Sequence, residues 1–137
     1  MPYDKSQFIG SELNNCPPDD AEGASGLIYR LVFHDPPIEK DFIPGAKLYP
    51  QYYGESSTKT EEEKCEGHGL SVCISREDAI RVKEANKGKW RKSMIAIANL
   101  QSECGRIKRT PKKGNDLHYT WWFPVEMEVW QLFDIVK

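Results

Sequence analysis

Residues 67–79 carry the clearest pattern of apolar and polar positions in the chain. Every second position is apolar, which is the period of a strand that buries one face, at Leu70, Val72 and Ile74. Ser75 then occupies an N-cap position, with Asp78 three residues later. A cap hydroxyl accepts from the N–H groups of the first turn, and acids there suit the helix dipole. The stretch therefore predicts a strand followed by a helix over about 76–86.

The same reading along the chain predicts further elements. Strands are expected where β-branched, aromatic and other apolar residues gather, at 27–33, 94–100, 106–110 and 118–123. The tail, 125–136, fits helical and strand spacing alike, and its composition favours a short turn and then a strand. A short helix is expected at 38–43 and a polar loop at 55–66. The sum is an α+β fold: a mostly antiparallel sheet of five or six strands with one main helix and one or two short helices.

The beginning of the chain differs in composition from the rest. Residues 1–25 are polar and interrupted by proline, glycine and asparagine, which predicts an N-terminal arm, either mobile or wrapped over the domain. The remainder, 26–137, has the size of one α+β domain.

Charge and cysteine content narrow the classes of partner. The net charge of −2 and the pI of about 5.9 give no overall bias toward nucleic acid or anionic membranes. No run approaches the roughly 20 apolar residues of a membrane span. The first ten residues lack a basic region followed by an apolar one, so no secretory signal is expected. Reduced thiols in a cytoplasmic protein are then the expected state of Cys16, Cys65, Cys73 and Cys104.

A metal site is the first candidate chemistry. Cys65, His68 and Cys73 are spaced nearly as metal ligands, and Cys104 could add a fourth thiolate. Cys73, however, lies inside a predicted strand, and the usual turn between paired cysteines is missing. The sequence therefore favours no metal, with an exposed cysteine, a loop histidine and a buried cysteine.

Nucleic-acid binding is the second candidate. A basic ribbon at 106–113 precedes aromatic residues that could stack on bases. The nearly neutral overall charge instead favours a solvated hairpin beside a hydrophobic core, so nucleic acid is not expected as a partner.

Nucleophilic catalysis is the third candidate. Ser71 and His118, with an acid, have the composition of a catalytic triad. Ser71 does not lie in a G-x-S-x-G elbow, so the sequence disfavours a serine hydrolase of that kind.

A fourth constellation resembles the ADP-ribosyltransferases. Arg30, Ser71 and the pair Glu126 and Glu128 follow the order of that family's arginine, serine and E-x-E motif. The resemblance implies that Arg30 and Ser71 would hold NAD and that Glu128 would orient the acceptor. The family expects Ser-Thr-Ser where this chain has Ser71–Val72–Cys73. The alternative is that both glutamates are exposed acids of a turn.

Short motifs over about residues 27–136 also resemble a group of small, functionally uncharacterised bacterial proteins. The group's pattern is roughly Y-R…P-P…D-F…G-[IL]-S-V…A…H-H-T-x-W. This chain has Tyr119 where the group often has histidine, and a longer insertion at 46–66. The resemblance implies no activity. It implies that one set of residues belongs together, namely Tyr29, Arg30, Asp41, Ser71, His118, Thr120 and Trp122.

The leading hypothesis is a cytoplasmic bacterial domain that binds a small ligand or a protein partner and needs no cofactor. Its binding residues would be Tyr29, Arg30, Ser71, His118, Thr120 and Trp122. The alternative is an ADP-ribosyl-type transferase that uses NAD, with Arg30, Ser71 and Glu128 as catalytic residues. In a third reading there is no ligand, and Arg30 and His118 are structural hydrogen-bonding groups.

Overall fold

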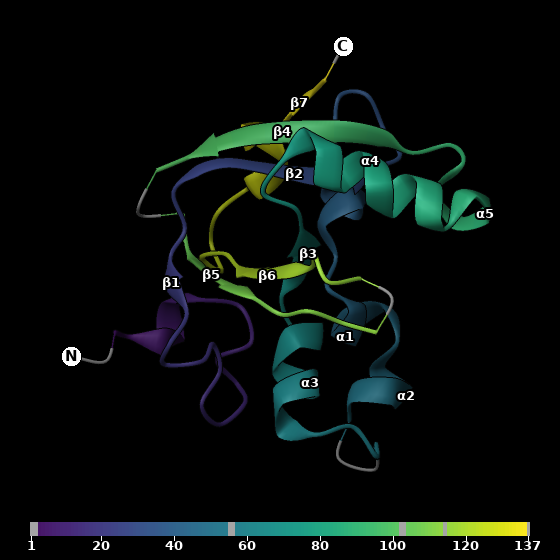
Figure 1. Cartoon of the computed structure of the whole chain (residues 1–137). Coiled ribbons are helices and arrows are strands. Elements are labelled where there is room, and N and C mark those ends of the chain that lie inside the picture. Colours follow the sequence, from purple (N-terminus) through teal and green to yellow (C-terminus); the bar gives the residue numbers. More distant parts are fainter. Residues whose placement is uncertain (1–2, 55–56, 102–103, 114, 137) are drawn as a thin grey trace.

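Two antiparallel sheets enclose the main hydrophobic core in the computed structural model, which describes residues 3–54, 57–101, 104–113 and 115–136 (Figure 1). The three-stranded sheet has the order β2-β4-β7, with β2 at Gly26–Val32, β4 at Met94–Leu100 and β7 at Asp134–Ile135. The four-stranded sheet has the order β1-β5-β6-β3, with β1 at Glu22–Gly23, β5 at Arg106–Arg109, β6 at Tyr119–Trp122 and β3 at Leu70–Val72.

Small residues in β4 face large ones in the opposite sheet. β2 and β4 pair along their full length, from Gly26 with Leu100 to Val32 with Met94. The buried alanines of β4, Ala96 and Ala98, belong to the same core cluster as Trp121 of β6. Close packing requires such complementarity, since a void beside the indole would forfeit its contacts.

The two sheets are joined at one point of backbone pairing. Tyr29 of β2 and Cys73, just after β3, exchange two N–H···O=C bonds of 2.8 Å. β2 therefore pairs with β4 in one sheet and touches the edge of the other. This junction brings Arg30, the next residue of β2, beside β3.

The helix predicted over 76–86 is confirmed as α4, Arg76–Ala85. The Ser75 side chain accepts from the N–H of Asp78 at 3.1 Å, as its position in the sequence indicates. The predicted stop after residue 86 is only a break, because Asn86 caps a further short helix, α5, at Lys87–Trp90. The other short helical segments are η1 (Lys5–Gln7), η2 (Glu39–Phe42), α1 (Gly45–Leu48), α2 (Pro50–Tyr53) and η3 (Val129–Leu132).

The polar loop predicted at 55–66 is wrong at 61–66, and residues 55 and 56 lie outside the described part. A second helix of seven residues, α3, runs over Glu61–Gly67. Thr60 and Glu63 cap it reciprocally: the Thr60 hydroxyl accepts from the N–H of Glu63, and the Glu63 carboxylate accepts from the N–H of Thr60. Three acids in the first turn suit the dipole, so what reads as a solvated acidic run starts a helix.

The α+β class and the antiparallel pairing are confirmed, whereas the finer architecture is wrong. The described residues form seven strands in two sheets, not five or six in one, and five α-helices, not one main helix with one or two short ones. β1 has only two residues and lies in the polar arm, so it is too short to give an alternating pattern that the sequence could reveal. None of the helices in the described ranges has the length and apolar character that crossing a membrane requires.

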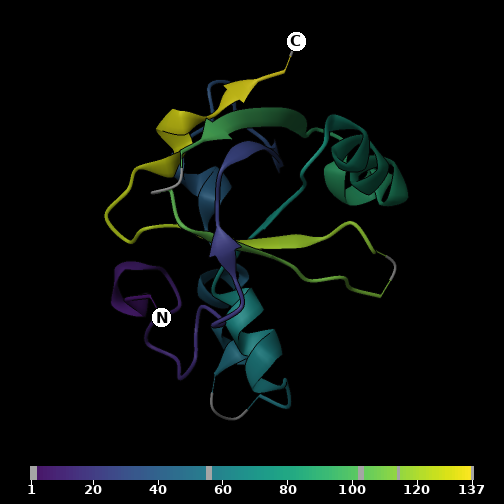
Figure 2. The same ribbon diagram turned by 60° about the vertical axis from the view of Figure 1, so that its left-hand side comes forward.

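The described part of the N-terminal arm packs on the four-stranded sheet and beside α3 (Figure 2). β1 pairs with β5, and Phe8 forms an isolated bridge with Pro124. Beneath the arm lies a second buried cluster, built from Cys16, Ala21, Cys65 and Trp122.

A disulfide between Cys16 and Cys65 ties the arm to α3. The prediction of four reduced thiols is therefore wrong for these two residues, while Cys73 and Cys104 are free and buried. The two bonded cysteines are 49 positions apart, so no local pattern could pair them.

We expect this bond to carry much of the protein's stability. Closing a loop of this length removes about 4 kcal/mol of chain entropy from the unfolded state in the loop-closure description. Urea unfolding of the oxidised protein, followed by tryptophan fluorescence, should therefore shift to lower urea when a reductant is added. The C16A/C65A variant should unfold at low urea with or without reductant. Equal midpoints for the oxidised and the reduced wild-type protein would contradict the bond.

Candidate functional site

A chain of hydrogen bonds runs across one face of the four-stranded sheet. Ser71 pairs with Thr120 in the β3–β6 register, so their side chains share a face. The Ser71 hydroxyl lies 2.7 Å from His118 Nε2, and His118 Nδ1 lies 2.8 Å from the Thr110 hydroxyl. The Thr110 hydroxyl in turn lies 2.7 Å from that of Thr120. These four side chains form one connected polar cluster.

The close packing of β3 on β6 depends on Gly69. A Cβ at this position would lie 2.5 Å from Thr120 Cγ2 and 3.1 Å from the indole nitrogen of Trp122. A side chain there would push the strand away from β6, so the glycine before β3 allows Ser71 to reach His118.

The neighbours of His118 fix its proton. The Thr110 carbonyl accepts from His118 Nδ1 at 3.0 Å, and a carbonyl can only accept, so Nδ1 carries the hydrogen. Nε2 is then the acceptor for the Ser71 hydroxyl. Burial lowers the pKa of His118 to about 4, and the nearby charges of Lys112 and Arg30 act in the same direction. His118 is therefore neutral at physiological pH.

Arg30 lies where the two sheets meet. Its Nε donates to the Asp41 carbonyl at 2.9 Å, and its Nη1 donates to the Ser71 carbonyl at 2.6 Å. The guanidinium also lies over the Phe42 ring, 5.5 Å from the centroid. Burial lowers the pKa of Arg30 to about 10 and the Asp41 carboxylate opposes the shift, so the group remains charged near neutral pH.

Asp41 organises the loop after β2. Its buried carboxylate accepts from the backbone N–H groups of Phe33 at 2.8 Å and Ile38 at 3.1 Å. It also lies 3.1 Å from Nδ1 of His34. A buried carboxylate needs such partners, and here they hold η2 against β2, where the Asp41 carbonyl receives Arg30.

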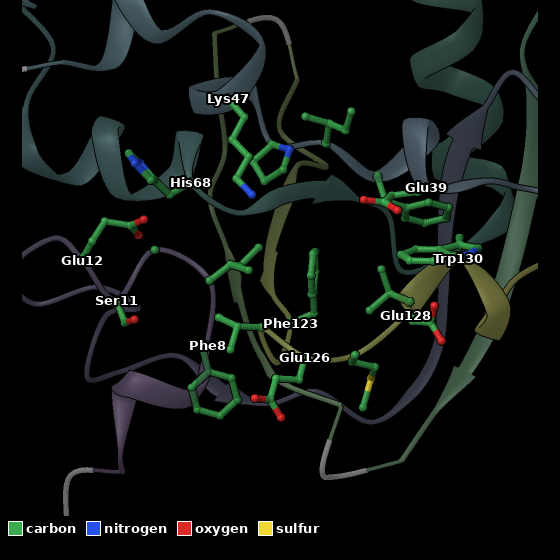
Figure 3. Close-up of a pocket in the computed structure, with 18 residues that line it drawn as sticks. Phe8, Ser11, Glu12, Glu39, Lys47, His68, Phe123, Glu126, Glu128 and Trp130 are labelled. Carbon is green, nitrogen blue, oxygen red and sulfur yellow. The ribbon is translucent and has the colours of Figure 1, made fainter.

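A cavity of about 500 Å³ lies apart from this cluster, between the arm, the η2–α1 region and the segment after β6 (Figure 3). Its apolar lining includes four aromatic side chains, which are Phe8, Phe42, Phe123 and Trp130. Its charged lining is mainly acidic, with Glu12, Glu39, Glu126 and Glu128 against Lys47. Figure 3 shows Glu12 on one side of the space and Glu39 and Glu128 on the other.

The structure brings only some of the predicted site residues together. Arg30, Ser71, His118 and Thr120 are connected by hydrogen bonds, as the motifs indicate. Tyr29 acts through its backbone, in the bridge to Cys73. Trp122 is fully buried in the second cluster, where its indole donates to the Cys65 carbonyl at 3.0 Å.

The transferase set is divided between two places. Glu126 and Glu128 line the cavity, whereas Arg30 and Ser71 are not among its lining residues. Nε and Nη1 of Arg30 and the Ser71 hydroxyl are already bonded within the protein.

The other candidate chemistries can also be placed. Cys65 lies in the disulfide, so it supplies no thiolate for zinc. In the basic ribbon, Arg106 donates to the Ala21 carbonyl, Arg109 donates to the Asp116 carbonyl, and Lys108 pairs with Asp20 at 3.0 Å. These contacts tie the ribbon to the arm and to its own turn.

Sequence reasoning missed Thr110 and the cavity. Thr110 is the last residue of the strand predicted at 106–110, and His118 is the first residue of the strand predicted at 118–123. A hairpin of these two strands would bring the two residues together, so their positions could have indicated the contact. The cavity walls come from four separated parts of the chain, 8–12, 39–47, His68 and 123–130, so no local pattern reveals them. Comparisons of the chain with protein-family models, with curated proteins and with solved structures gave no match. The resemblance to small bacterial proteins therefore stays a prediction.

The buried, neutral His118 should make the protein less stable in mild acid. The pKa of His118 is about 4 in the folded protein, and the usual histidine value of 6.5 applies to the unfolded chain. Between these two pH values only the unfolded chain binds the proton. Stability should therefore fall as the pH drops below 6.5, by about 2–3 kcal/mol at pH 4.5. Urea unfolding at pH 7 and pH 4.5 measures the fall in the free energy of unfolding between the two pH values. This fall should be about 2–3 kcal/mol smaller in His118→Gln than in the wild type. An equal loss in both proteins would contradict it.

Proposed function

We propose that this protein binds a small organic cation in the cavity between the arm and the segment after β6. The observation that supports the proposal is four glutamates around a cavity that four aromatic side chains also line, with no salt-bridge partner for any of the glutamates among the described residues. A positively charged ligand group would supply that partner.

The lining also indicates the rest of the ligand. A cavity of about 500 Å³ is in the range that holds metabolite-sized molecules. Aromatic walls stabilise an apolar body and attract a cation through the ring faces. Lys47 is the one lysine among the lining residues and can hold a single acceptor atom of the ligand. The ligand class is therefore an amine with an aromatic or aliphatic body.

The other hypotheses draw less support from the contacts. Ligand binding by Arg30, Ser71, His118 and Thr120 stays a prediction, because each of these side chains already makes a hydrogen bond within the protein. ADP-ribosyl transfer with NAD also stays a prediction, because Glu128 lies in a cavity that Arg30 and Ser71 do not line.

The disulfide is evidence about the cellular compartment in which the protein is found. The cytoplasmic location is a prediction from the sequence, and the Cys16–Cys65 bond favours an oxidising compartment instead. Thiol alkylation at the moment of cell lysis should leave Cys16 and Cys65 unmodified in protein taken from its native host. Alkylation of both would support a reducing, cytoplasm-like environment.

The ligand class can be tested with three compounds that share one body. Phenethylamine should raise the melting temperature, because only the ligand-bound folded state gains its binding energy. Phenethyl alcohol should raise it less, and phenylpropionate should not raise it, because the glutamates repel a carboxylate. The E126Q/E128Q variant should weaken phenethylamine binding about tenfold in calorimetry, the effect of roughly 1.4 kcal/mol.

Glu84→Gln is the matched control, since it removes an exposed carboxylate on α4 outside the cavity lining. It should bind phenethylamine as the wild type does. Equal affinity for the amine and the carboxylate, or no effect of E126Q/E128Q, would exclude the proposed ligand class.

A further inference from the structure

Ser71 is the accessible end of an otherwise buried hydrogen-bond chain. The residue is exposed, whereas His118 and Thr110 are 7% and 6% exposed and Thr120 is fully buried. An exposed serine could satisfy its hydroxyl with water, yet here the hydroxyl is aimed inward at a histidine nitrogen 2.7 Å away. Ser71 is therefore an exposed residue whose hydroxyl has a buried proton acceptor beside it.

The proton arrangement suits the activation of that hydroxyl. Because the Thr110 carbonyl requires the hydrogen on Nδ1, His118 Nε2 is free to accept the Ser71 proton. Thr110 is itself held by its N–H bond to the His118 carbonyl at 2.9 Å and by the Thr120 hydroxyl. A hydroxyl, a base within hydrogen-bond reach and a group that orients the base are the parts of an activated nucleophile.

Two positively charged side chains, those of Arg30 and Lys112, lie near Ser71 and His118. Arg30 donates to the carbonyl of Ser71 itself, and Lys112 lies close enough to His118 to influence it. Lys112 is only loosely engaged, with 3.9 Å between its Nζ and a Glu66 oxygen. Positive charge beside the hydroxyl would stabilise an oxyanion that forms there.

From this geometry we propose that Ser71 is a nucleophile, with His118 as its general base, that is acylated by carboxylic esters. This activity is separate from ligand binding in the cavity, which neither residue lines.

The reaction balances without a cofactor. Ser71 Oγ bonds to the ester carbonyl carbon as its proton passes to His118 Nε2; the carbon–oxygen bond to the alcohol then breaks, and the alcohol oxygen takes that proton. Water next attacks the acyl carbon and gives a proton to Nε2, and the bond to Ser71 Oγ breaks as Oγ recovers it. One ester and one water give one acid and one alcohol.

Diisopropyl fluorophosphate tests the nucleophile directly, because Oγ displaces fluoride from phosphorus and leaves a stable adduct. Intact mass and peptide mapping of the full chain should find one adduct, on Ser71. Ser71→Ala should abolish it. His118→Gln should slow it at least a hundredfold, the effect of losing a general base. Ser25→Ala, which removes an exposed serine elsewhere, should leave the rate unchanged.

The pH dependence distinguishes activation from simple exposure and needs no variant. Since His118 is neutral above mild acid, the labelling rate at Ser71 should be level between pH 6 and 8. A serine without a base reacts through hydroxide and gains about tenfold per pH unit. 4-Nitrophenyl acetate hydrolysis should follow the same profile and disappear in Ser71→Ala. No adduct on Ser71, or a labelling rate at Ser71 that rises about tenfold per pH unit between pH 6 and 8, would overturn the proposal.

Discussion

The arrangement of the molecule depends on one partly buried arginine. Arg30 belongs to β2, donates to the backbone of Ser71 in β3 and donates to the backbone of Asp41 in η2. Removing a guanidinium from water is costly unless its donors are matched, so β3 and η2 are each required to present a carbonyl at this point. Among the described residues, the two sheets meet through backbone pairing at Tyr29 and Cys73, and Arg30 extends that junction by one residue. Its charge thereby fixes how the two sheets approach each other.

The sequence predicts those elements whose determining residues lie close together along the chain. α4 is predictable because its cap, its acids and its apolar stripe all lie within twelve residues. α3 was equally local, since Thr60 and Glu63 form a capping box, but the run of acids was interpreted as a solvated loop. The division into two sheets is not predictable, because it depends on the bridge between Tyr29 and Cys73 and on two strands, β1 and β7, of two residues each.

The candidate site divides in the same way. Ser71 and Thr120 lie on strands whose alternation is visible in the sequence, and an arginine inside an apolar strand demands partners, so their association could be inferred. Thr110 completes the cluster through a hairpin contact that depends on register. The cavity and the disulfide join segments from the first sixteen residues to positions far along the chain, and no pattern within a short window encodes such contacts.

One strand connects both candidate sites. In β6, Thr120 belongs to the hydrogen-bond chain, Trp121 fills the main core and Trp122 fills the second cluster, because consecutive residues of a strand face opposite sides. Phe123, the next residue, lines the cavity. The supports of the two sites nevertheless differ. The cavity wall formed by the arm is tied down by the disulfide, whereas the contact between Ser71 and His118 rests on the pairing of β3 with β6. Reduction should therefore loosen the cavity while leaving the serine and the histidine in place, and this difference allows the two proposed activities to be tested separately in one protein.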